Sequence, residues 1–235
     1  MPKKYMIIIL TYVLAQFATV LPYYLTKIID INNLPYVTVI WNIVVFGIAV
    51  IISLLLLKSE IRDFFQAREK GIGQIILWSI LGFFLVMIAQ GVSSVIERFI
   101  IGVDTASENT LVLMQVAREI PVFLLIITIL GPILEELVFR KAIFGSLYKR
   151  MNFFFSAIIS GVLFAVLHMD FSHLLTYIAA ATVFAFLYVE TKKIIVPIIV
   201  HMSMNTMAVI AQLSLDPEQV EQLMEQLQLI LLGGY

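Results

Sequence analysis

The sequence has little charge and no cysteine. Only 13% of the 235 residues are charged, against 61% that are hydrophobic, which excludes a soluble globular domain. The absence of cysteine excludes disulfides, a thiol nucleophile and cysteine-ligated zinc. Internal repeats and low-complexity segments are also lacking, so neither a solenoid nor a disordered linker is expected. What remains is a polytopic membrane protein.

Long apolar runs bounded by charged residues predict an all-α fold, a polytopic membrane helical bundle of about seven to eight transmembrane helices. Each span takes about 20 residues, so the length allows a single integral-membrane domain over 1–235. The expected spans cover 5–25, 34–57, 72–95, 120–147, 153–168, 171–189 and 194–213. We also expect a short interfacial helix at 110–118 and an amphipathic surface tail at 217–232.

Basic residues gather on one side of these spans. Those at 3–4, 58–70, 149–150 and 192–193 fall on the side of the N-terminus, whereas only Lys27, Arg98 and Arg118 fall on the other. The positive-inside rule therefore predicts a multi-pass cell-membrane protein whose N-terminus is cytoplasmic. No nucleic-acid partner is expected, and the sequence gives no oligomeric state.

Three polar clusters interrupt the apolar runs over about 120–213. They are Glu135, Glu136 and Arg140; then Phe164 and His168; then His201 and Asn205. Two ionised carboxylates at the centre of a bilayer cost about 5–7 kcal/mol, so the helix needs them protonated, paired or facing a wet cavity. We expect a cavity between helices, at roughly one depth of the membrane.

Glu136 and Arg140 stand four residues apart with the acid first, which predicts an intrahelical ion pair. Glu135 is turned about 100° away and remains the available carboxylate. The preceding Gly131-Pro132 removes the hydrogen bond to the Thr128 carbonyl, which predicts a kink beside Glu135.

The other two clusters each place polar side chains one helical turn apart. The ring of Phe164 is expected to wall the imidazole of His168. Asn205, on the same face as His201, needs a hydrogen-bond partner or a substrate inside a membrane. His173 lies in a polar turn and is expected to be a loop residue without a catalytic role.

A carboxylate, two imidazoles and an amide in a wet pocket can activate water against an amide carbonyl. Glu135 would be the general base, aided by His168, while His201 and Asn205 would stabilise the oxyanion. Alternatively, Glu135, His168 and His201 could hold zinc, since His₂Glu is a known catalytic ligand set. The residues themselves do not separate these two readings, and no HExxH motif is present.

The motifs Glu135-Glu136-x-x-x-Arg140, Phe164-x-x-x-His168 and His201-x-x-x-Asn205 resemble the EExxxR, FxxxH and HxxxN motifs of the CAAX protease and bacteriocin-processing (CPBP, or Abi) family of intramembrane endopeptidases. The resemblance covers about 120–213. It implies that Glu135, His168, His201 and Asn205 are catalytic and that Glu136 and Arg140 support them. It leaves metal dependence open.

The leading hypothesis is therefore an intramembrane endopeptidase that cleaves a membrane-associated peptide or protein near the cytoplasmic half of the bilayer. One alternative is a non-enzymatic membrane scaffold or bacteriocin self-immunity protein that binds a peptide or partner. Another is a proton-coupled transporter using Glu135, although the unequal spans show no repeated halves. The family resemblance also implies peptide processing or bacteriocin immunity as roles.

Overall fold

A computed structural model describes residues 1–26, 33–66, 71–103 and 107–214. The expected tail at 217–232 lies outside these residues. The described residues form helices and no strands, in agreement with the predicted all-α fold. Their order is α1 (Lys3–Ala18), α2 (Leu21–Leu25), α3 (Leu34–Leu56), α4 (Lys58–Gln66), α5 (Ile72–Ile96), η1 (Glu97–Ile101), α6 (Glu108–Glu119), η2 (Pro121–Phe123), η3 (Ile126–Leu130), α7 (Gly131–Glu135), η4 (Glu136–Phe144), α8 (Gly145–Leu147), α9 (Phe153–Leu167), η5 (Phe171–His173), α10 (Leu174–Thr191) and α11 (Ile195–Ser214).

Five segments are long and apolar enough to cross a membrane. They are Leu34–Leu56, Ile72–Ile101, Pro121–Leu147, Phe171–Thr191 and Ile195–Ser214. The expected span at 153–168 is the shorter apolar helix α9. The expected span at 5–25 is divided into α1 and α2, because Pro22 opens a new helix and the Thr19 hydroxyl caps the Gln16 carbonyl at 2.7 Å. The chain is thus a multi-pass membrane bundle.

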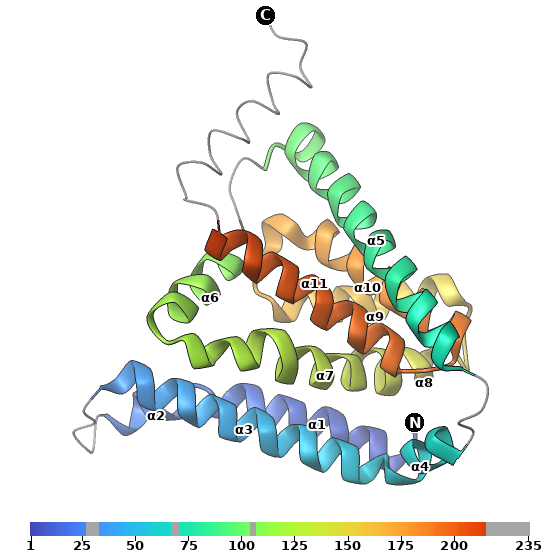
Figure 1. Ribbon diagram of the computed structural model, residues 1–235, viewed down its shortest axis with the longest axis horizontal. Coiled ribbons are helices and arrows are strands. Elements are labelled where there is room, and N and C mark those ends of the chain that lie inside the picture. Colours follow the sequence, from blue (N-terminus) through green and yellow to red (C-terminus); the bar gives the residue numbers. More distant parts are fainter. Residues whose placement is uncertain (27–32, 67–70, 104–106, 215–235) are drawn as a thin grey trace, which may run out of the picture.

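The helices pack in a fixed sequence of layers around the segment 121–147 (Figure 1). The hairpin of α1 and α3 lies along one side of this segment and contacts η3, α7 and η4. On the other side lie α9, α10 and α11, and α5 covers the outer surface of α10 and α11. The segment that carries Glu135 is therefore enclosed from both sides.

Small residues allow the close approach of these layers. A Cβ atom added to Gly82 of α5 would lie 2.6 Å from the Leu187 side chain of α10, so that side chain would have to move to admit a larger residue. A helix is present where an interfacial one is expected: α6, whose first turn is capped by Ser107 Oγ accepting from the Thr110 amide at 3.2 Å. Its interfacial position stays a prediction. In Figure 1, α6 lies at the end of the bundle opposite α4 and α8.

Candidate active site

The segment 121–147 departs from α-helical geometry on both sides of Glu135. Turns of π-helix cover Ile126–Leu130 and Glu136–Phe144, with five α-helical residues between them. The Gly131 amide donates to the Ile126 carbonyl, five residues back, and a Cβ atom on Gly131 would lie 2.9 Å from that carbonyl oxygen. Glycine is therefore required where the wide turn ends.

This wide turn changes which carbonyl proline leaves without a donor. In a regular α-helix, the N–H that Pro132 lacks would donate to the Thr128 carbonyl, as the sequence predicts. Where the hydrogen bonds span five residues, the carbonyl left without this donor is that of Ile127. The Asn205 amide of α11 donates to the Ile127 carbonyl at 2.9 Å. Asn205 thus replaces the amide that Pro132 lacks and fixes α11 to the segment before Glu135.

The predicted ion pair between Glu136 and Arg140 is present. Arg140 Nε lies 3.2 Å from Glu136 Oε2, and both side chains are almost fully buried. The terminal nitrogens of Arg140 find no hydrogen-bond acceptor among the described residues and face aromatic rings instead, with the guanidinium carbon 4.5 Å from the Phe164 centroid and 4.9 Å from that of Phe184. The cation is held by one carboxylate and two ring faces.

Glu136 has a second partner that the sequence does not reveal. His201 Nδ1 lies 2.9 Å from Glu136 Oε1, and an ionised carboxylate only accepts, so Nδ1 carries the hydrogen. The ring of Phe184 stacks on His201 at 4.8 Å between centroids. Only Nε2 of His201 remains available, and it lies 3.7 Å from Glu135 Oε2.

His168 is held in the same way by a different acceptor. Its Nδ1 lies 2.8 Å from the Phe164 carbonyl, which leaves Nε2 as the available ring nitrogen. The Phe164 ring packs against the imidazole at 4.5 Å between centroids, as the sequence predicts, and Tyr177 packs against it at 4.3 Å. Phe164 also lies 6.1 Å from the ring of His201 and so contacts both histidines.

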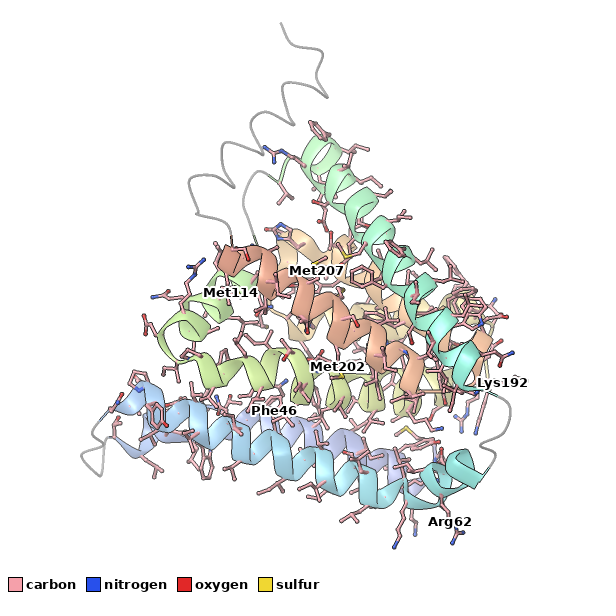
Figure 2. All side chains as sticks on the ribbon, viewed as in Figure 1. Phe46, Arg62, Met114, Lys192, Met202 and Met207 are labelled. Carbon is pink, nitrogen blue, oxygen red and sulfur yellow. The ribbon has the colours of Figure 1, made fainter. Side chains whose placement is uncertain are left out.

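One cavity of about 480 Å³ joins these side chains. Of the residues predicted to act, Glu135, Phe164, His168, His201 and Asn205 line it, whereas Glu136 and Arg140 lie behind its wall. Phe46 of α3, labelled in Figure 2, lines the cavity from the side of the α1–α3 hairpin. His173, expected to lack a catalytic role, lines the same cavity and pairs with Asp170 at 3.0 Å.

The side chains do not support the zinc alternative. Within the described ranges, no three residues of the types His, Cys, Asp and Glu are grouped so that they could hold a metal ion. Glu135 and His201 are close, but His168 does not complete a ligand set with them. As placed in the structure, these residues do not fit a His₂Glu site.

Several residues of the site were not predicted from the sequence. Tyr177 and Phe184 stand seven residues apart with Ala180 and Ala181 between them, an aromatic stripe on one face of α10 that the sequence does show. Glu97 is a buried carboxylate that accepts from the Thr176 amide at 2.9 Å and from its hydroxyl at 2.6 Å. It caps the start of α10 and so positions the neighbouring Tyr177.

Comparison with known proteins identifies one relative that covers the whole chain and others that cover part of it. The Rce1-like family of type II CAAX prenyl endopeptidases matches residues 117–207. The putative membrane peptidase YdiL of Bacillus subtilis is 39% identical over 242 residues, covering 100% of this chain and 99% of that protein. The membrane-embedded CAAX protease MroQ of Staphylococcus aureus is 42% identical over 158 residues, 65% of this chain and 64% of that protein.

A third relative, the UPF0177 protein YxdF of Lactococcus lactis, is 40% identical over 81 residues, 34% of this chain and 44% of that protein. No solved structure matches significantly. A bundle of membrane-spanning helices, a cavity lined by the motif residues and similarity along the full chain agree with one another. The chain belongs to the CPBP family of CAAX protease-like membrane peptidases.

Proposed function

We propose that this membrane protease hydrolyses a peptide bond with Glu135 as general base for a water molecule. The observation that carries the proposal is the difference between the two adjacent carboxylates. Glu136 is engaged by Arg140 and His201, whereas Glu135 lines the cavity, has a 16% exposed side chain and receives no hydrogen bond from the described residues. A cavity-facing carboxylate that accepts no hydrogen bond of its own from the described residues is the group able to accept a proton.

In the proposed reaction, Glu135 removes a proton from water while the water oxygen attacks the peptide carbonyl carbon. The carbonyl π electrons move onto its oxygen, which accepts hydrogen bonds from the second N–H of Asn205 and from Nε2 of His201 in its protonated form. When the carbon–nitrogen bond breaks, Glu135 returns its proton to the leaving amine. Nε2 of His168 orients the attacking water as an acceptor.

The proposed substrate is a membrane-associated peptide or protein, cleaved in the cytoplasmic half of the bilayer. Among the relatives, the names of YdiL and MroQ denote a membrane peptidase and a CAAX protease, which favours this class over a scaffold or immunity protein. Peptide maturation and the processing of peptide signals are the roles that fit such a substrate. We place the N-terminus in the cytoplasm, on the side of Arg62 and Lys192, which lie at the same end of the bundle (Figure 2).

The test is cleavage of a library of membrane peptides by the purified, reconstituted protein and by Glu135→Gln, each with and without a chelator. We expect the substitution to reduce cleavage at least about 100-fold, as loss of a general base does, without changing thermal unfolding. Loss of cleavage by the wild type in the presence of the chelator would establish metal dependence. Undiminished cleavage by folded Glu135→Gln would contradict the proposal, and a folded wild type that binds peptides but cleaves none would favour the scaffold alternative.

A further inference from the structure

The N-terminal helix α1 contributes directly to the wall of the active-site cavity. Tyr12 is only 2% exposed, and its ring meets Phe139 of η4 edge-on, at 5.8 Å between centroids. Tyr12 and Gln16 of α1 line the cavity together with Asn42 of α3, on the side opposite α9, α10 and α11. These three residues lie outside the segment 117–207 that the CAAX endopeptidase family matches, and none belongs to the three motifs.

This wall carries a hydrogen-bond donor and an acceptor without partners. Gln16 Nε2 donates to the Tyr12 hydroxyl at 2.8 Å, so the hydroxyl hydrogen is directed to another acceptor, and the described residues provide none. Asn42 Oδ1 is buried and likewise receives no hydrogen bond from the described part of the chain. A buried polar atom without a partner costs about 1–3 kcal/mol, so such atoms beside an active site indicate a ligand.

The position of the wall is fixed independently of any ligand. Trp41 Nε1 donates to the Ala18 carbonyl at 2.7 Å, which joins α3 to the end of α1 immediately beside Asn42. Ile8, one turn before Tyr12, is fully buried and anchors α1 in the core. The donor and the acceptor are therefore presented on rigid helices.

We propose that Tyr12, Gln16 and Asn42 form a main-chain binding strip for the substrate, an inference that rests on the proposed function. The Tyr12 hydroxyl donates to a peptide carbonyl, and Asn42 Oδ1 accepts from a peptide amide. In a helical substrate, the backbone carbonyls and amides are already hydrogen-bonded to one another, whereas in an unwound segment they are available to the strip. The substrate class is accordingly a membrane peptide whose helix is interrupted near the cleaved bond.

The test uses Tyr12→Phe and Asn42→Leu, with Tyr5→Phe as matched control. Tyr5 lies seven residues before Tyr12 on the same helix face, but its hydroxyl lies 3.4 Å from Glu60 and lines a different cavity. Binding of a fluorescent peptide with a central Gly-Pro is measured in the Glu135→Gln background, so the readout does not depend on cleavage. Each strip variant should raise the dissociation constant of the peptide about 5- to 10-fold, as the loss of one hydrogen bond does. Tyr5→Phe should leave it unchanged.

In otherwise wild-type protein, the same two substitutions should raise KM by a similar factor, leave kcat within about twofold and leave the pH profile unchanged. A matched helical peptide without the Gly-Pro should bind more weakly to every protein. Equal binding by the strip variants and the control would overturn the strip while the proposed function stands. Normal binding with cleavage absent from otherwise wild-type protein would instead overturn the proposed function.

Discussion

Glu135 and Glu136 are adjacent in the sequence and both lie near His201, but their surroundings differ. Glu136 is buried against Arg140 and His201, and Glu135 faces the cavity. The Nδ1 hydrogen of His201 depends on Glu136, so Glu136 determines which nitrogen of that histidine reaches the cavity. Glu136 therefore orients His201, and Glu135 is the carboxylate that we propose accepts a proton.

We predict that Glu136→Gln lowers the free energy of unfolding by about 3–5 kcal/mol, because it leaves Arg140 charged and buried without a counter-ion. Glu135→Gln, at a cavity-facing position, should change stability by less than about 1 kcal/mol. Chemical unfolding in detergent micelles measures both. In the same measurement, Glu136→Met combined with Arg140→Met should recover most of the stability but no activity; stability unchanged by Glu136→Gln would contradict the buried pair.

The residues of this site were predictable to the extent that their partners are local. The pair of Glu136 and Arg140 and the contact of Phe164 with His168 lie within single helices, so spacing alone indicates them. The bond from His201 to Glu136 spans 65 residues and depends on how α11 faces η4, which no local pattern encodes. The contribution of Tyr12 from α1 was missed for the same reason.

At the scale of helices, Pro132 and Asn205 act as one unit. Proline leaves the Ile127 carbonyl without a donor, and Asn205 supplies one from another helix. The sequence predicts a distortion at Gly131-Pro132, but it assigns the freed carbonyl to Thr128, because it assumes α-helical hydrogen bonds up to that point. The π-helical turn was not predicted, because Gly131-Pro132 is equally compatible with a kink in an otherwise regular α-helix.

Asn205→Ala should lower the free energy of unfolding by about 1–3 kcal/mol, because the Ile127 carbonyl loses the donor that replaces the missing amide of Pro132. Pro132→Ala restores a backbone amide at the position able to reach Ile127, so the double variant should be more stable than the sum of the two single effects. A double-mutant cycle by chemical unfolding measures this coupling. Strictly additive effects would show that Asn205 does not replace the missing amide.

A second inter-helix connection is centred on Glu60 of α4, which lies outside the membrane-spanning segments. Glu60 pairs with Lys4 of α1 and Lys141 of η4. Burial raises the pKa of Glu60, but the hydrogen bonds and charges of Lys141 and Lys4 lower it by more. The pKa of Glu60 therefore lies below its ordinary value. The stabilisation is therefore fully present above the ordinary pKa of about 4.3 and is lost as pH falls through the folded-state pKa.

Between pH 6 and pH 3, the wild type should accordingly lose more thermal stability than Glu60→Gln, by about 2–4 °C for a partly exposed pair. The unfolding temperatures of both proteins in the same micelles measure the difference. Glu119→Gln, which removes an exposed carboxylate of α6 at the other end of the bundle, controls for a general effect of acid. Parallel curves for the wild type and Glu60→Gln would contradict the role of this pair.

At the scale of the whole molecule, the sequence already specifies a polytopic helical bundle and most of its spans. Composition and run length decide this, since a membrane leaves few alternatives to helices. The division of 5–25 into two helices and the position of α1 against the catalytic segment follow from packing instead. The tail at 217–232 and the proposed orientation remain predictions.

The orientation is open to direct measurement because the chain has no cysteine of its own. Val112 of α6 is 61% exposed and Lys149 lies beyond α8, at opposite ends of the bundle (Figure 1). We predict that Val112→Cys reacts with a membrane-impermeant thiol reagent in intact cells, whereas Lys149→Cys reacts only after permeabilisation. The opposite labelling pattern would place the N-terminus outside.

The wide turn at Ile126–Leu130 also determines where this segment can be shortened without harm to the site. A π-helical turn holds one residue more than the α-helical turn it replaces, so deleting one residue there would let regular hydrogen bonds form. Later side chains would keep nearly the same direction, because the full turn is completed either way. A deletion in the α-helical residues between Leu130 and Glu135 would instead rotate Glu135 by about 100° around the helix axis and out of the cavity, although no catalytic residue had been substituted. A helix shortened after the wide turn could therefore inactivate the enzyme, whereas one shortened within it need not.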